Sequence, residues 1–239
     1  MGIVLAILLF GFIVFFHELG HFLLARINGI NVYEFWIGMG PTLAHKKIGN
    51  TDYCLKILPI GGACVMGEDE KEDLSEGSFN SKSPWRRISV IAAGPVFNFI
   101  LAFVLSMFII GSIGYDKPVI LQVSDGYPAA EAGLKEGDIV KKINHSNIHV
   151  AREVTNYVTF HQKQSVTMTV ERDGKDITVQ MDPVANESGR YIFGISCSSN
   201  YREKCGILGT LKYSAYEVKY WIQLTIESIK MLFTGQASI

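Results

Sequence analysis

The sequence has almost no excess of charge of either sign, and it has few cysteines. Its 239 residues carry 22 lysines and arginines against 23 aspartates and glutamates, a formal net charge of −1. This balance provides no basic field for a polyanion, so we expect no nucleic-acid partner. The cysteines form no Cys-x-x-Cys pair or regular metal-binding spacing; they are Cys54, Cys64, Cys197 and Cys205. A disulfide between Cys197 and Cys205 is left open.

Two long stretches lack charged side chains almost completely. Residues 2–25 contain a single formally charged side chain, Glu18, and residues 88–114 contain none. Each stretch is long enough to cross a bilayer as a helix. The first has no basic residue before its apolar part and is as long as a full span, so we favour a membrane helix over a cleaved signal peptide.

The motif His17-Glu18-Leu19-Gly20-His21 lies inside the first apolar stretch. Residues four apart share a helix face, so the two histidines can bind one metal ion, and neutral imidazoles suit zinc. A glutamate beside such a pair can serve as the general base of a hydrolase. Ionisable groups at membrane depth are costly and usually functional, which argues against a chance match. We therefore predict Zn²⁺ bound by His17 and His21, with Glu18 as the catalytic base for peptide hydrolysis within the membrane.

Basic residues predict the orientation in the membrane. Arg26 follows the first apolar stretch, and Arg86 and Arg87 precede the second. The positive-inside rule then places residues 26–87 in the cytoplasm and everything after about Tyr115 outside.

The segment between the two spans is predicted to form a β-loop. Residues 51–60 have the composition of a strand, a turn is expected at Gly61-Gly62, and residues 63–66 would follow as a second short strand. An unpaired edge of these strands could bind an extended peptide, whereas a plain connecting hairpin is the alternative. Residues 68–83 are acidic and polar and are expected to be a solvated linker.

Residues 116–196 have the composition of a small soluble α+β domain. Strands are expected over 119–123, 139–143, 166–170, 177–181 and 191–195, with a hairpin turn at 171–174 and helices over 129–134 and 151–161. Residues 206–233 then predict an amphipathic helix, with charged side chains along one face. Such a helix would lie on the membrane surface or, alternatively, pack on the soluble domain.

Four motifs in this order resemble the site-2 protease family of intramembrane zinc metalloproteases, in its bacterial regulator-of-sigma-factor branch. The first motif is the HExxH helix. The second combines Gly38-Met39-Gly40-Pro41 and Leu58-Pro59-Ile60-Gly61-Gly62. The third combines Pro84-Trp85-Arg86-Arg87 and Ala93-Gly94-Pro95-Val96-Phe97-Asn98, and the fourth is residues 127–138. The resemblance implies an α-helical transmembrane core (helix 1 over 1–25, helix 2 over 88–114) with a membrane-associated β-loop within the cytoplasmic segment 26–87. It also implies a PDZ-like domain over 116–196 and an amphipathic juxtamembrane helix over 206–233.

The resemblance also implies roles for three further residues and a location. Gly61 and Gly62 would shape a strand that holds the substrate in extended form. Asn98 would face the active site and hydrogen-bond to the substrate backbone; alternatively, its amide would satisfy backbone groups freed by Pro95. Substrates would be single-pass membrane proteins such as anti-sigma factors. The protein would lie in the cytoplasmic (inner) membrane as a multi-pass protein, in contact with the lipid bilayer and with its PDZ-like domain outside.

One element of the family pattern is missing from residues 1–239. The family takes its third zinc ligand from an aspartate in an Asn…Pro…Leu-Asp-Gly motif, and this sequence contains no such motif. Catalytic zinc normally has three protein ligands. We therefore expect a C-terminally truncated chain that is inactive by itself. The alternative is a non-catalytic, membrane-anchored PDZ adaptor that binds peptides.

Overall fold

The computed structural model describes residues 2–67, 74–161, 163–186, 189–197 and 201–234. It consists of two compact units, residues 1–102 and residues 103–239, and the division falls inside a long helix. Part of the predicted acidic linker, residues 68–73, lies outside the described residues.

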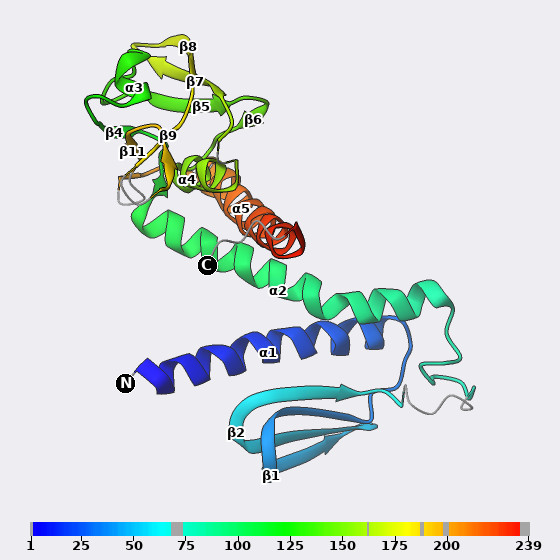
Figure 1. Ribbon diagram of the computed structural model, residues 1–239. Helices are drawn as coiled ribbons and strands as arrows, with labels where there is room; N and C mark the ends of the chain where they lie inside the picture. Colours follow the sequence, from blue (N-terminus) through cyan, green and yellow to red (C-terminus); the bar gives the residue numbers. More distant parts are fainter. Residues whose placement is uncertain (1, 68–73, 162, 187–188, 198–200, 235–239) are drawn as a thin grey trace. The chain divides into compact units, whose positions relative to one another are not determined.

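Both predicted spans are helices in the structure (Figure 1). They are α1, Gly2–Ile27, and α2, Pro84–Ile113, and both are long and apolar enough to cross a membrane. Only 6% of the most apolar window of α1 and 11% of that of α2 is buried. A core helix of a soluble protein would be covered by other elements, so this exposed apolar surface fits a lipid environment better.

Two long strands follow α1 and form a curled antiparallel hairpin. They are β1, Glu34–Ile48, and β2, Thr51–Val65. The first part of β1 pairs with both ends of β2, since Glu34 lies opposite Asp52 as well as Val65. Figure 1 shows β2 beside α1. Apolar side chains, including Leu43, Ile57 and Leu58, are more than half exposed on this hairpin.

The turn predicted at Gly61-Gly62 is wrong. The chain reverses instead at Gly49, which has φ +62°, and β2 continues through both glycines to Val65. Gly61 adopts φ +85° inside the strand, a conformation that glycine tolerates without steric cost. A glycine pair between apolar residues therefore marks an irregularity within a strand here, and not the end of the strand.

The core of the first unit lies where the end of α1, the start of α2 and the hairpin meet. Its buried members are Ala25, Ile30, Val32, Phe35, Cys64, Met66, Phe79 and Val90. The rings of Phe22 and Tyr53 pack on each other and on Phe35 at the border of this core, at centroid distances of 5.1 to 6.2 Å.

The second unit is built on a four-stranded antiparallel sheet in the order β6-β5-β7-β8. These strands are β5 (Ile139–Ile143), β6 (Ser146–Asn147), β7 (Val166–Arg172) and β8 (Lys175–Met181). The hairpin turn predicted between the last two is present, with Asp173 at φ 51° and Gly174 at φ 75°. Two helices accompany the sheet, α3 (Pro128–Glu131) and α4 (Ala151–Phe160).

Short strand pairs complete this unit. β4 (Ile120–Val123) pairs with β11 (Ile195–Cys197), β3 (Tyr115–Asp116) with β12 (Arg202–Glu203), and β9 (Val184–Ala185) with β10 (Tyr191–Ile192). The single strand predicted over 191–195 is wrong, because Gly194 adopts φ +81° and separates β10 from β11. All four cysteines are free thiols, so the structure contains no Cys197–Cys205 disulfide.

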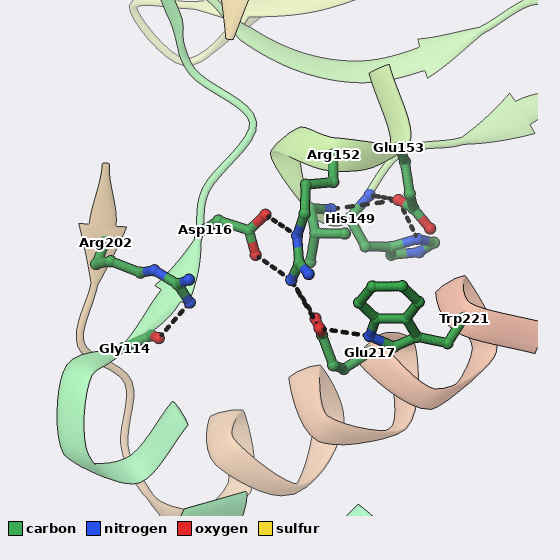
Figure 2. A network of polar contacts seen from close by, with 9 residues as sticks. Gly114, Asp116, His149, Arg152, Glu153, Arg202, Glu217 and Trp221 are labelled. Carbon is green, nitrogen blue, oxygen red and sulfur yellow. Dashed lines mark hydrogen bonds and ion pairs between the residues drawn. The ribbon is translucent and has the colours of Figure 1, made fainter. Parts of the chain in front are cut away.

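The last helix, α5 (Ile207–Thr234), packs against α4 through a buried polar network (Figure 2). Arg152 on α4 donates from Nε to Asp116 at 2.9 Å and from Nη2 to Glu217 of α5 at 2.6 Å. Trp221 donates its indole N–H to the same glutamate at 3.1 Å. Burial lowers the pKa of the Arg152 guanidinium, but the hydrogen bonds to the two carboxylates outweigh burial and raise it above its ordinary value. The start of α5 is therefore held on α4. This agrees with the second of the two predictions for this helix, that it packs on the soluble domain and does not lie on the membrane surface.

Candidate metal centre and active site

The two histidines of the HExxH motif lie on one face of α1, because the helix runs without interruption through the motif. The ring centroids of His17 and His21 are 4.9 Å apart, with the ring planes inclined by 74°. Both side chains are half-buried.

The Nε2 atoms of the two rings both lie close to Gly94 of α2. A β-carbon built on Gly94 would lie 2.4 Å from Nε2 of His21 and 2.5 Å from Nε2 of His17, so only a residue without a side chain lets both nitrogens approach this point. Zinc–nitrogen bonds are about 2.0–2.1 Å long, so two imidazole nitrogens that face the same point can share one ion beside Gly94. These residues therefore fit a zinc ion, with two protein ligands.

The Nδ1 atoms of both rings face α2. Nδ1 of His21 donates to the carbonyl oxygen of Val90 at 2.7 Å, and Nδ1 of His17 lies 3.2 Å from Nδ2 of Asn98. Val90, Gly94 and Asn98 are spaced by four residues and therefore share one face of α2. No role was predicted from the sequence for Val90 or Gly94. Their four-residue spacing from Asn98 is visible in the sequence, but it indicates a shared site only when the contact between α2 and α1 is known.

Two glycines of α1 allow the close packing that this arrangement needs. A β-carbon on Gly20 would come within 2.6 Å of the carbonyl oxygen of Ala93 on α2, and one on Gly11 within 2.3 Å of that of Pro59 on β2. Real β-carbons do not approach oxygen atoms so closely, and small residues at such contacts are the usual means of close helix packing in membranes.

Glu18 lies beside the strand that was predicted to hold the substrate. A β-carbon on Gly62 would lie 3.1 Å from Cγ of Glu18 and 3.0 Å from the carbonyl oxygen of Trp36. Gly62 thus lets β2 run close to the candidate base. The equivalent atom on Gly61 would lie 2.9 Å from Cγ of Met39, so Gly61 faces the hairpin itself.

One edge of β2 is free next to Glu18. Residues 62–65 pair with β1 through their inner edge, Gly62 opposite Ile37 and Val65 opposite Glu34. Among the strands that the structure describes, none pairs with the opposite edge of these residues. An unpaired edge can accept a further extended chain.

A third metal ligand is absent from the described part of the chain. Within residues 2–67, 74–161, 163–186, 189–197 and 201–234, no group of three or more His, Cys, Asp or Glu side chains is placed to hold a metal ion. His17 and His21 are therefore the two candidate ligands, with Glu18 beside them.

The second unit carries a separate groove between α4 and the β10–β11 segment. It has a volume of about 310 Å³, and its lining includes Val154, Val158, Phe193, Ile195 and Cys197. Burial raises the pKa of the Cys197 thiol to about 12, so this side chain stays neutral and contributes to an apolar wall.

Comparison with known proteins identifies the family. The model of Peptidase family M50 matches residues 5–239. The chain belongs to Peptidase family M50. This membership confirms the predicted site-2 protease family and the prediction of a metalloprotease. The M50 match includes α1 with its HExxH motif, α2 and the rest of the second unit.

Relatives within M50 are similar over nearly the whole chain. A candidate zinc metalloprotease of Clostridium acetobutylicum is 36% identical over 238 residues, which cover 99% of this chain and 70% of that protein. The zinc metalloprotease RasP of Bacillus licheniformis is 31% identical, with 98% of this chain and 75% of that protein covered. The regulator of sigma-W protease RasP of Bacillus subtilis is 29% identical, with 96% and 74% covered.

Solved structures give a weaker similarity. The PDZ domain of an SdrC-like protein from Listeria monocytogenes covers 35% of this chain, and 90% of that domain is covered, at 21% identity and a TM-score of 0.31. The corresponding domain from Listeria innocua covers 37% of this chain, and the whole of that domain is covered, at 20% identity and a TM-score of 0.33.

Proposed function

We propose that this protein is an intramembrane zinc metalloendopeptidase that cleaves the transmembrane segments of single-pass proteins. The observation that carries this proposal is the convergence of the His17 and His21 Nε2 atoms on one point beside Gly94. This point lies between two exposed apolar helices, and Glu18 follows His17 on α1.

Each residue of the motif has a distinct task in this reaction. His17 and His21 would hold the zinc ion, whose chemistry when bound would be to polarise a scissile carbonyl and to make water more acidic. Glu18 takes the proton from the attacking water and returns it to the amine of the leaving fragment. The half-buried position of the carboxylate limits access of bulk water to this proton transfer.

The free edge of β2 is the proposed holder of the substrate. A transmembrane helix has its peptide groups fully hydrogen-bonded, so it must unwind before a base can act on a peptide bond. Pairing with residues 62–65 would compensate the released backbone groups and would place the extended segment beside Glu18.

The protein would lie in the cytoplasmic membrane as a multi-pass protein with its soluble unit outside. The basic residues Arg26, Arg86 and Arg87 support this orientation. Substrates of the anti-sigma-factor class are supported by the Bacillus subtilis relative, which is named a regulator of sigma-W protease.

A catalytic zinc ion would need a third ligand besides the two histidines. The described residues supply two histidines, and the chain covers 70–75% of the length of the three relatives named above. With two ligands the ion is bound weakly and incompletely, so residues 1–239 alone are expected to be inactive.

A second function, a peptide-binding adaptor, is favoured by the groove between α4 and β11. This groove, which has both apolar and polar lining residues, lies beside an edge strand, an arrangement that suits an extended peptide or a chain terminus in a PDZ-like domain. In a protease the groove would select or gate substrates, whereas in an adaptor peptide binding would be the whole activity.

Metal content separates the two functions. Purified protein should contain zinc, which should be lost in His17→Ala and His21→Ala and kept in Glu18→Gln, because Glu18 is a base and not a ligand. A folded sample without zinc would favour either the adaptor or a metal site that is incomplete without its third ligand. Cleavage of a model transmembrane substrate by residues 1–239 that disappears in Glu18→Gln would show that the third ligand is not needed.

A further inference from the structure

The contact between Asn98 and His17 contains a conflict of hydrogen-bond donors. Nδ2 of Asn98 lies 3.2 Å from Nδ1 of His17 and can bond to it only if Nδ1 is an acceptor. A neutral imidazole with an accepting Nδ1 carries its proton on Nε2, and a protonated Nε2 cannot bind a metal ion. Since Nε2 of His17 is the atom that faces Gly94, metal binding requires the other tautomer.

A second observation concerns the other end of the same amide. Oδ1 of Asn98 is buried and has no hydrogen-bond partner. A buried acceptor without a partner costs about 1–3 kcal/mol, so it is seldom left in this state. Turning the amide by half a turn about the Cβ–Cγ bond exchanges the two atoms and resolves the donor conflict, because Oδ1 then accepts the proton of Nδ1–H. The position without a partner is then occupied by the amide nitrogen.

The neighbouring ligand already has this arrangement. Nδ1 of His21 donates to the carbonyl oxygen of Val90, which leaves Nε2 free to bind a metal. Val90 lies two turns before Asn98 on the same face of α2, with Gly94 between them. With the Asn98 amide turned, one face of α2 would offer an oxygen acceptor to each histidine, with Gly94 between the two acceptors.

We propose that Asn98 is a positioning residue that orients His17 for metal binding through its side-chain oxygen. This inference rests on the proposed zinc site. In this arrangement Oδ1 fixes both the tautomer and the ring direction of His17, as outer hydrogen-bond partners of zinc-bound histidines generally do. The amide N–H₂ group then becomes available to a substrate carbonyl, so the same side chain can also serve the substrate-binding role predicted from the sequence.

The test measures metal affinity in the whole chain by competition with a chelator, using Zn²⁺ and, for the visible spectrum, Co²⁺. Asn98→Leu keeps the shape of the side chain and removes its oxygen, and should weaken binding by about 10–100-fold, the usual effect of losing such a partner. Asn98→Asp keeps an oxygen acceptor and should restore binding and the Co²⁺ spectrum of the wild type.

A matched control is available at the end of α1. Asn28 donates from Nδ2 to Ser89 Oγ at 3.2 Å and to the carbonyl oxygen of Leu24 at 2.8 Å, so it also joins the α1 segment to α2 but touches no histidine. Asn28→Leu should leave metal affinity unchanged. Equal losses in Asn28→Leu and Asn98→Leu would show that helix packing alone is responsible and would overturn the inference.

Two further outcomes would also overturn it, and they can be told apart. Wild-type affinity in Asn98→Leu, or equal weakening in Asn98→Leu and Asn98→Asp, would remove the role of Asn98 while leaving the zinc site in place. If the wild-type chain binds no metal, or binds metal with the same affinity as His17→Ala, the zinc site itself is rejected and with it the role of Asn98.

Discussion

The absence of a side chain at Gly94 lets both histidine rings approach α2. A β-carbon on Gly94 would lie 2.4 and 2.5 Å from the Nε2 atoms of His21 and His17, which is too close for any real contact. Alanine is a better helix former than glycine by about 1 kcal/mol, so Gly94→Ala should leave α2 intact but push the two rings out of their positions for metal binding. We expect zinc content to fall to the level of His17→Ala in a protein with unchanged helix content.

A glycine further along the same helix is the control for this substitution. A β-carbon on Gly111 would meet only Thr210 Cγ2, at 3.8 Å, which is an ordinary contact. Gly111→Ala should therefore keep its zinc. If Gly94→Ala binds zinc as well as Gly111→Ala does, the proposed position of the ion is wrong.

At the scale of elements, a buried charge network holds α5 on α4. Asp116 is 1% exposed and bonds to Arg152, which also bonds to Glu217. Removing one member of a buried ion pair leaves an uncompensated charge and costs about 3–5 kcal/mol. Arg152→Leu should therefore destabilise the second unit and speed hydrogen exchange of the amides in the first half of α5.

An exposed pair on the same helix shows what a surface ion pair contributes. Lys230 and Glu227 are bonded at 2.9 Å with side chains 62% and 39% exposed. Lys230→Met should change stability by less than about 1 kcal/mol. Equal hydrogen exchange in Arg152→Leu and Lys230→Met would mean that the network does not hold α5 in place.

At the scale of the whole molecule, the orientation in the membrane is a prediction from the distribution of basic residues. The arginines after α1 and at the start of α2 predict that the β-loop, residues 26–87, is cytoplasmic and that residues after about Tyr115 are outside. A reporter enzyme that is active only outside the cytoplasm should therefore be active when fused near residue 150 and silent when fused near residue 75. The reverse pattern would invert the proposed topology.

Much of this architecture could be predicted because its signals are local. Apolar length determines α1 and α2, and the turn residues Asp173 and Gly174 determine the β7–β8 hairpin. The errors at Gly61-Gly62 and Gly194 share one cause. Glycine permits positive φ in a turn, within a strand and between two strands, and only the surrounding pairing selects among these.

The sequence by itself determined the candidate ligands, the candidate base and the two apolar helices, because a four-residue spacing on a helix and a run of apolar residues need no knowledge of the rest of the chain. Only the tertiary structure decided which groups of α2 and β2 meet them. Val90, Gly94 and Asn98 face the histidines, and Gly62 faces Glu18, because the close packing at Gly11 and Gly20 brings these elements together. Contacts between residues some seventy to eighty positions apart depend on how whole helices pack, and no local pattern carries that information.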